Sequence, residues 1–256
     1  GQQIAENGLP DALTPFTIAF TGYGNVSQGA QEIIGLLPVI EISPDELLSL
    51  KKRSKIPDNL IYKIIFREEH LVEPIEPGIE FDLQDYYTEP EKFRSVFEKY
   101  IPHLDMMINC VYWDIRYPRL VTKDYLQQLF AQGTPKLKVI GDISCDVNGS
   151  VECTDKGTEI EDPIFVYHPG TRTHTMGHKG EGVLVMAVDI LPSELPRDSS
   201  AGFADVLINY VKAIADCDFS DDFLKLDLPN AIRSALILHR GELTPHYKYL
   251  EEYVSV

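Results

Sequence analysis

Two glycines separated by one residue, Gly22 and Gly24, follow an apolar run that alternates like a β-strand and precede a run with helical spacing. In a strand–turn–helix unit, such a turn lets backbone N–H groups and the helix N-terminus face a pyrophosphate. The pattern departs from G-x-G-x-x-G, because the third glycine is Gly29 and Ser27 takes its usual place. The turn predicts a dinucleotide site, while a plain βα connection and the adenosine part of a methyl donor stay open.

Two aspartates four residues apart, Asp142 and Asp146, follow another apolar run that is typical of a buried strand. An idle buried carboxylate is costly, so one of the two is expected to bond an amide or amine, or to move a proton. We predict that Asp146 has this role, because Asp142 can brace the loop. The alternative is a strand-end cap and turn.

A third apolar run ends in polar and aromatic residues, which are Asn109, Cys110, Val111, Tyr112 and Trp113. Ligands of an open α/β sheet bind at the carboxyl ends of its strands. Asn109 and Tyr112 are therefore candidates to face the ribose or the nicotinamide, and Trp113 is a candidate pocket wall. A core strand ending in a packed aromatic pair explains the same residues equally well.

Ser43 follows the strand expected at 39–42, where NAD-binding domains usually place a carboxylate for the ribose hydroxyls. Three cations come a helix-length later, at positions 51–53. A missing carboxylate with nearby cations favours the 2′-phosphate of NADPH, whereas Glu41 and Asp45 leave room for NAD. Ser43 is also a helix cap, with proline next and Glu46 three residues on.

Histidines and cysteines in the second half of the chain suggest zinc, but their spacing matches no compact structural site. We predict no metal and place His168, His174 and His178 on a hairpin or at the surface.

The composition is that of a globular protein, with 256 residues, 44% hydrophobic and 25% charged. The net charge of −17 argues against nucleic acid and anionic membrane as partners. No run of 18 apolar residues and no signal-peptide pattern is visible. The four cysteines form no C-x-x-C pair, which favours a reducing compartment.

Strand patterns alternate with helix patterns over the first two thirds of the chain. Strands are expected at 16–20, 39–42, 60–66, 105–112, 137–144 and 182–189, and helices at 25–37, from 43, from 88 and at 123–131. Loops and a short hairpin fill 145–179. This order predicts an α/β fold: a Rossmann-like, doubly wound, mostly parallel sheet with helices on both faces.

C-terminal helices complete the predicted fold. One is expected to begin at Asp198 or Ser199, and another to run from Pro229 to Gly241, before an aromatic tail. We predict a lead-in at 1–14, a dinucleotide-binding domain at 15–192, and a helical segment at 193–256. That segment would pack on the domain or on an absent N-terminal one.

Several stretches together resemble one family. They are 21–33, 108–113, 141–146 with 149–152, 187–192 with 195–200, and 239–244 with 247–249. In order along nearly the whole chain, they look like the lysine–ketoglutarate reductase part of bifunctional aminoadipic semialdehyde synthase. Weaker similarity extends to fungal saccharopine dehydrogenase, alanine dehydrogenase and the soluble transhydrogenase domain.

The resemblance implies an NADPH-dependent reductive amination, in which lysine condenses with 2-oxoglutarate and the imine is reduced to saccharopine. NADH is not excluded. By that likeness the pyrophosphate would lie on Gly22, Tyr23, Gly24, Asn25 and Val26. The nicotinamide end would be lined by Asn109, Cys110, Val111 and Tyr112, and by Val188, Asp189 and Leu191. Asp146 matches an aspartate beside the nicotinamide.

Members of this family carry substrate-binding residues in a domain before the glycine turn, whereas this sequence begins about twenty residues before Gly22. We therefore expect a coenzyme-binding fragment with little turnover alone, and expect the substrate domain as its partner. Self-association is possible, and both cytosol and mitochondrial matrix fit. A non-catalytic Rossmann-like interaction module is the main alternative, and a methyltransferase-like enzyme is a third.

Overall fold

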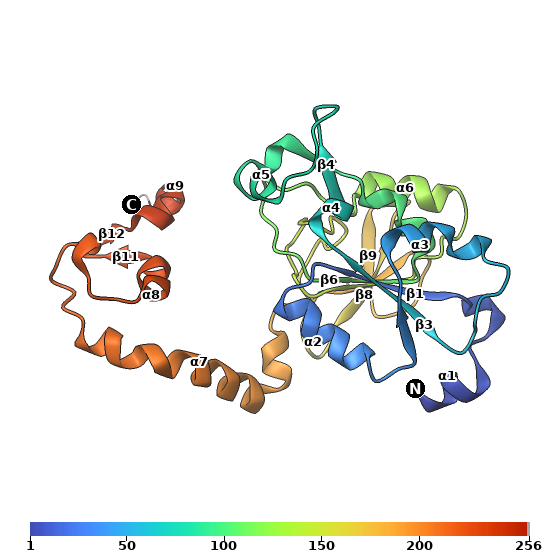
Figure 1. Ribbon diagram of the computed structural model, residues 1–256, viewed down its shortest axis with the longest axis horizontal. Helices are drawn as coiled ribbons and strands as arrows, with labels where there is room; N and C mark the ends of the chain where they lie inside the picture. The colour runs from blue at the N-terminus through green and yellow to red at the C-terminus, as the bar shows by residue number, and fades with distance from the viewer. Residues whose placement is uncertain (255–256) are drawn as a thin grey trace. The chain divides into compact units, whose positions relative to one another are not determined.

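The computed structural model describes residues 1–254 of the chain, and these form two compact units, Gly1–Leu191 and the described residues from Pro192 onward (Figure 1). Residues 1–14 are part of the first unit and form α1 (Gln2–Asn7) and a 3₁₀ turn (Asp11–Leu13).

An eight-stranded sheet forms the centre of the first unit, with the order β2-β3-β1-β6-β7-β10-β8-β9. The first six strands in this order, β2 through β10, are parallel to one another. The last two, β8 and β9, pair antiparallel at the β10 side. The strands are β1 (Phe16–Thr21), β2 (Val39–Glu41), β3 (Ile61–Phe66), β6 (Met106–Asn109), β7 (Val139–Asp142), β8 (Ile164–His168), β9 (Thr173–Met176) and β10 (Val183–Met186). The predicted fold class is confirmed.

Apolar residues cover both faces of the sheet, because neighbouring positions along β1 point to opposite sides. Ile18 and Phe20 belong to one buried cluster and Ala19 to the other. The helices of this unit are α2 (Asn25–Ile34), α3 (Pro44–Ser49), α4 (Glu68–Leu71), α5 (Leu83–Thr88) and α6 (Lys123–Ala131). Figure 1 shows α2 on one side of the sheet and α3 and α6 on the other.

The path of the chain through the sheet decides where a ligand can bind. The chain leaves β1 for β2 at the sheet edge, returns to β3 beside β1, and then crosses to β6 on the other side of β1. This change of direction opens a crevice at the carboxyl ends of β1 and β6. In the common dinucleotide-binding order, the second strand lies next to the first. Here the third strand takes that place.

The helix expected from position 88 onward is wrong. Pro90 opens only a 3₁₀ turn (Pro90–Lys92), and β5 (Phe93–Ser95) then pairs with β4 (Val72–Pro74) in an antiparallel ribbon. Two further 3₁₀ turns follow, at Phe97–Lys99 and Ile101–His103. Phe97 and Tyr100 are buried all the same, so turns and a strand reproduce the apolar spacing that suggested a helix.

Two elements at the ligand edge of the sheet are shorter than expected. β6 ends at Asn109, so residues 110–113 form a loop rather than the end of a strand. α2 ends at Ile34. Ala30 and Ile34 pack against the apolar cluster on β1, but Val26 and Ile33 are exposed, so only part of the helical apolar spacing faces the sheet.

The second unit contains a long helix, α7 (Pro196–Asp216), which begins before Asp198 and Ser199 because Pro196 occupies its first position. α8 (Asn230–Ala235) ends well before Gly241. A short hairpin, β11 (Leu238–His239) with β12 (Glu242–Leu243), follows instead, since Arg240 and Gly241 both have positive φ at its turn. The described chain ends in a 3₁₀ helix (Pro245–Leu250) and α9 (Glu251–Val254).

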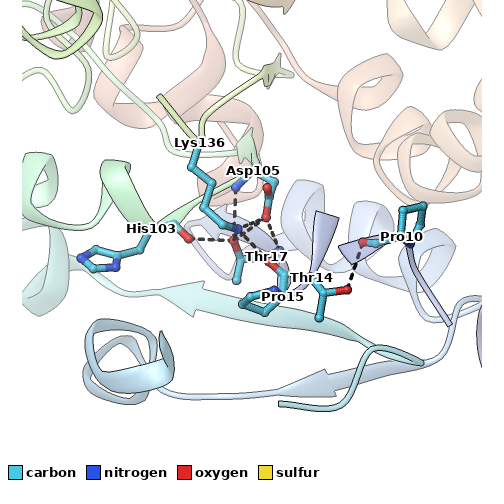
Figure 2. A network of polar contacts seen from close by, with 7 residues as sticks. All are labelled: Pro10, Thr14, Pro15, Thr17, His103, Asp105 and Lys136. Atoms are coloured by element: carbon cyan, nitrogen blue, oxygen red, sulfur yellow. Dashed lines mark hydrogen bonds and ion pairs between the residues drawn. The ribbon is translucent and has the colours of Figure 1, made fainter. Parts of the chain in front are cut away.

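A largely buried ion pair lies at the opposite, amino edge of the sheet (Figure 2). Asp105, just before β6, accepts hydrogen bonds from the backbone N–H and the hydroxyl of Thr17 at 2.7 and 2.9 Å. The same carboxylate pairs with the ammonium of Lys136, which also donates to the carbonyl of Pro15 at 2.8 Å. One carboxylate and one ammonium thus join the beginnings of β1 and β6 to the segment before β7.

The Asp105 contacts predict a large loss of stability on truncation. Asp105→Ala leaves the Lys136 ammonium and the Thr17 amide without their partner, so the free energy of unfolding should fall by about 3–5 kcal/mol in urea titrations. Glu73→Ala removes the exposed pair with Arg94 and should change it by less than about 1 kcal/mol. Equal effects of the two changes would show that the buried pair has no special weight.

Candidate functional site

The glycine turn lies where the crevice opens. Gly22 has φ +86°, and its N–H donates to the carbonyl of Phe66 at the end of β3. A Cβ on Gly22 would come within 3.3 Å of the Cys110 carbonyl oxygen, whereas one on Gly24 would meet nothing within 4 Å. The chain therefore requires glycine at 22 for its fold, and Gly24 borders open space directly before the first amides of α2.

A cavity of about 350 Å³ lies at this turn. Its lining joins the carboxyl ends of β1, β3 and β6, through Gly22–Gly24, Glu68 and Leu71, and Cys110–Trp113. Small-molecule sites are commonly cavities of this size with apolar walls and few polar groups. Six predicted coenzyme-binding residues are therefore brought together: Gly22, Tyr23, Gly24, Cys110, Val111 and Tyr112.

Aromatic rings form one wall of this cavity. The indole N–H of Trp113 donates to the carbonyl of Tyr117 at 3.0 Å, and the Tyr117 ring packs edge-on against Tyr86 with centroids 5.2 Å apart. The guanidinium of Arg119 lies 5.3 Å from the Trp113 ring. The expectation that Trp113 borders a pocket agrees with this geometry.

Two charged residues follow β3 near the cavity: Glu68 lines it, and Arg67, which is not among the lining residues, contacts the lining residue Tyr23. Arg67 is exposed, and its guanidinium lies over the Tyr23 ring, 4.4 Å from the centroid. Glu68 lines the cavity and accepts a hydrogen bond from the Tyr87 hydroxyl at 2.8 Å. Burial, together with this carboxylate, raises the pKa of Tyr87, so its hydroxyl stays protonated and remains a donor.

A buried polar network lies behind the cavity and ties three strand ends together. Asn109 accepts from the hydroxyl of Thr21 at 2.7 Å and donates through its amide nitrogen to Asp142 and Ser150, both at 2.8 Å. Asp142 also accepts from the Thr154 hydroxyl. Asn109 is therefore a structural bond between β1, β6 and β7 and is not among the residues that line the cavity.

The two aspartates differ in burial and in their contacts, and the chemical role expected of Asp146 stays a prediction. Asp142 is buried and braces the loop after β7, because it also accepts from the Cys145 backbone N–H at 3.2 Å. Asp146 is half-buried and is not among the cavity-lining residues. Burial raises the pKa of Asp146, and the charge of Asp142 adds to that shift. A raised pKa makes the carboxylate of Asp146 a better proton acceptor than a free one.

The remaining predicted coenzyme-binding residues lie outside the cavity lining. Asn25 and Val26 are the exposed first residues of α2. Ser43 caps α3 in a complete capping box with Glu46, as its pattern indicates. Beyond β10, Val188 is buried and bridges to Thr158, Asp189 is exposed, and Leu191 is half-buried.

The cations expected near Ser43 do not all lie at the ligand edge. Lys51 borders a separate cavity with Pro15 and Lys136, which are at the amino edge of the sheet. Ser43 itself follows β2, the edge strand, rather than the strand beside β1. The topology thus places positions 43 and 51–53 one strand further from β1 than the common strand order would, and their contact with the coenzyme ribose stays a prediction.

Comparison with known families gives a match over residues 79–246, to the C-terminal domain of alanine dehydrogenase/PNT. The chain belongs to this family. Members of the alanine dehydrogenase/PNT family are oxidoreductases, and membership implies a nicotinamide coenzyme. The match begins after the glycine turn, so it is independent of the motif that first predicted a dinucleotide.

Individual relatives extend the match over almost the whole chain. The Arabidopsis thaliana α-aminoadipic semialdehyde synthase is 38% identical over 98% of this chain, and the mitochondrial enzyme of that name from Mus musculus is 32% identical over 98%. The chain spans 24% and 28% of these two proteins. The resemblance predicted from the sequence motifs is confirmed. A solved L-alanine dehydrogenase aligns with 99% of this chain and 58% of its own, at a TM-score of 0.46 and 17% identity.

Several residues that line the cavity of this alanine dehydrogenase/PNT family member were not predicted from the sequence. Glu68 and Leu71 come from the short α4 after β3, and Tyr86 and Tyr87 from α5. The adjacent tyrosines at 86 and 87 were a visible signal, since paired aromatics often wall a ligand site. Nothing local in the sequence shows that they face the glycine turn.

The cysteines and histidines of the described residues show no sign of a reactive thiol or a metal site. Burial raises the pKa of the Cys110 and Cys145 thiols to about 11, so both stay protonated at neutral pH. His168 and His174 lie on the predicted hairpin, β8–β9. Among residues 1–254, no three His, Cys, Asp or Glu side chains are grouped to hold a metal, and no helix has the length and apolarity to span a membrane.

Alanine substitutions of Asp142 and Asp146 should lower the free energy of unfolding by different amounts. Asp142→Ala leaves three donors without an acceptor and should lower the free energy of unfolding by about 2–4 kcal/mol. Asp146→Ala removes a half-buried side chain and should lower it by less than about 1 kcal/mol. Chemical denaturation of both variants measures the difference. A larger loss for Asp146→Ala would mean that Asp146, and not Asp142, braces the loop.

Proposed function

We propose that this chain is the NADPH-binding portion of a lysine–ketoglutarate reductase, which forms saccharopine from lysine and 2-oxoglutarate in lysine degradation. The observation that carries the proposal is one cavity built from the glycine turn and the loop after β6, at the reversal point of a parallel sheet. The similarity to α-aminoadipic semialdehyde synthases along 98% of the chain supports the substrate class.

The glycine turn fits a pyrophosphate. The first N–H groups of a helix have no partners within the helix, and those of α2 begin beside the open space at Gly24. Neutral amides and the helix dipole can bind phosphate in a protein whose net charge is −17. Gly22–Val26 would hold the diphosphate, and Cys110–Tyr112 would contact the nicotinamide end, with Val188, Asp189 and Leu191 beyond it.

The proposed reaction needs a bound amine, a bound oxo acid and a proton donor. The lysine ε-amine condenses with the 2-oxoglutarate carbonyl and releases water, and reduction of the resulting imine carbon is completed by a proton at nitrogen. The coenzyme, when bound, supplies the hydride. Asp146 is the candidate for the proton transfer, because by resemblance it matches an aspartate beside the nicotinamide; burial and the charge of Asp142 also raise its pKa.

The substrates require more protein than this unit. The chain spans only 24% and 28% of the Arabidopsis thaliana and Mus musculus synthases. We propose that a further substrate domain completes the site and that this chain alone has little turnover. The mouse relative is named as mitochondrial, and we propose the mitochondrial matrix or the cytosol as the compartment of this protein.

Coenzyme binding is the direct test of this proposal. The chain should bind NADPH saturably in calorimetry or through energy transfer from Trp113, whereas no binding of NADPH or NADH at millimolar concentration would contradict it. Gly24→Asp places a carboxylate against the diphosphate and should reduce affinity at least about 100-fold. The fold should survive, since no atom lies within 4 Å of the added Cβ and φ at Gly24 is −71°.

Gly29→Asp is the matched control, because Gly29 is also exposed and its Cβ also meets nothing within 4 Å. It adds the same charge further along α2 and should change NADPH affinity much less. If both aspartates weaken binding equally, the effect is long-range charge repulsion and the diphosphate does not lie on the turn.

The role of Asp146 is tested in a longer protein that also carries the substrate domain. Asp146→Ala should lower kcat by about 100-fold or more, as expected for loss of a proton-transfer group, with NADPH affinity nearly unchanged. Loss of coenzyme affinity with unchanged kcat would instead make Asp146 a binding residue.

A second candidate is a non-catalytic interaction module, and one observation favours it. The 21-residue helix α7 has no buried residue, and Phe203, Val206 and Val211 on it are exposed. Exposed apolar side chains of this kind are typical of docking surfaces. An interaction module needs no nucleotide, so the NADPH titration separates the two functions.

A further inference from the structure

The strand beside β1 decides which coenzyme ribose a Rossmann-like domain accepts. In the common strand order, the residue after that strand contacts the adenosine ribose, with a carboxylate for the 2′-hydroxyl or an arginine for the 2′-phosphate. In this sheet the neighbour of β1 is β3, paired from Phe16↔Ile61 to Thr21↔Phe66. The selecting position is therefore after Phe66, and not after β2.

Arg67 occupies that position. Phe66 is fully buried, so Arg67 is the first side chain beyond β3 that can reach a ligand. Its guanidinium lies 4.4 Å from the ring centroid of Tyr23, inside the glycine turn. The backbone N–H of Arg67 donates to Nδ1 of His70 at 3.1 Å, which fixes the turn after the strand.

The charge of Arg67 is available to a ligand. Among the described residues, no carboxylate pairs with its guanidinium, whereas acidic partners are present for Arg53, Arg94, Arg116, Arg172 and Arg240. Arg119, Arg197 and Arg233 also have no acidic partner there, but none of them follows the strand beside β1. The neighbouring acid, Glu68, is engaged by the Tyr87 hydroxyl. A guanidinium that lies over an aromatic ring and has no acidic partner can offer its N–H groups to a phosphate in bidentate contact.

We propose that Arg67 binds the 2′-phosphate of NADPH and is the residue that selects NADPH over NADH. This inference rests on the proposed function, since it places the coenzyme's adenosine end at the mouth of the same cavity. It also moves coenzyme selection from the β2 end and the cations at 51–53 to the β3 end.

Calorimetric titration of the full chain with NADPH and NADH tests the assignment. The unchanged protein should bind NADPH at least about tenfold more tightly than NADH. Arg67→Gln should weaken NADPH binding about 10- to 100-fold and leave NADH within about twofold, because only NADPH loses a charge-assisted contact. Arg67→Lys keeps the charge without the fork and should give an intermediate NADPH affinity.

Arg53→Gln is the matched control, because it removes a guanidinium from the cation group expected near Ser43. It should change neither affinity. A loss of NADPH binding in Arg53→Gln, with Arg67→Gln unaffected, overturns the proposal and returns selection to the β2 side.

The other outcomes are equally distinct. If Arg67→Gln lowers the affinities for NADPH and NADH equally, Arg67 does not select between the coenzymes and instead positions Tyr23. Binding of NADH as tight as that of NADPH by the unchanged chain also overturns it, while a nicotinamide coenzyme site remains. Binding of neither coenzyme is the failure of the proposed function itself, and the inference fails with it.

Discussion

The amide of Asn109 is the contact on which the ligand edge of this fold depends. It joins the hydroxyl of Thr21 at the end of β1 to the carboxylate of Asp142 at the end of β7, and Asn109 itself ends β6. All three groups are buried, so each would lose its hydrogen bonds if the strand ends separated. The loops that leave these strands therefore start from fixed points.

The buried carboxylate in this network also sets the electrostatics around it. The charge of Asp142 adds to burial in raising the pKa of Cys110, Cys145 and Asp146. Burial is the larger cause for each of these groups, so their charged forms are disfavoured mainly by the loss of hydration.

Local sequence patterns predict much of this structure, and they fail where long-range pairing decides. The glycine turn, the capping box at Ser43 and the β8–β9 hairpin depend on neighbouring residues and were predictable. The place of β3 beside β1 depends on residues more than forty positions apart in the chain, and no local pattern encodes it. The expected helix from position 88 failed for a related reason, since β5 exists only through its pairing with β4.

The candidate site shows the same division. Gly22, Gly24 and Trp113 were predictable because glycine spacing and a lone tryptophan are visible in the sequence. Arg67 and Tyr87 were not, because their proximity to the glycine turn follows from strand order. The direction of the Asn109 side chain was not predictable either, because successive side chains of a strand point to opposite faces and the last residue of β6 is not evident from the sequence.

The Lys136–Asp105 ion pair stabilises the amino edge of the sheet, while the candidate ligand site lies at the carboxyl edge. Lys136 and Asp105 hold the beginnings of the strands, at the edge of the sheet opposite the glycine turn. Exposed loop residues at the carboxyl edge can accordingly change, in evolution or in engineering of coenzyme preference, without affecting the Lys136–Asp105 pair that stabilises the sheet. Such a scaffold is a good starting point for altering what a domain binds while leaving intact how it folds.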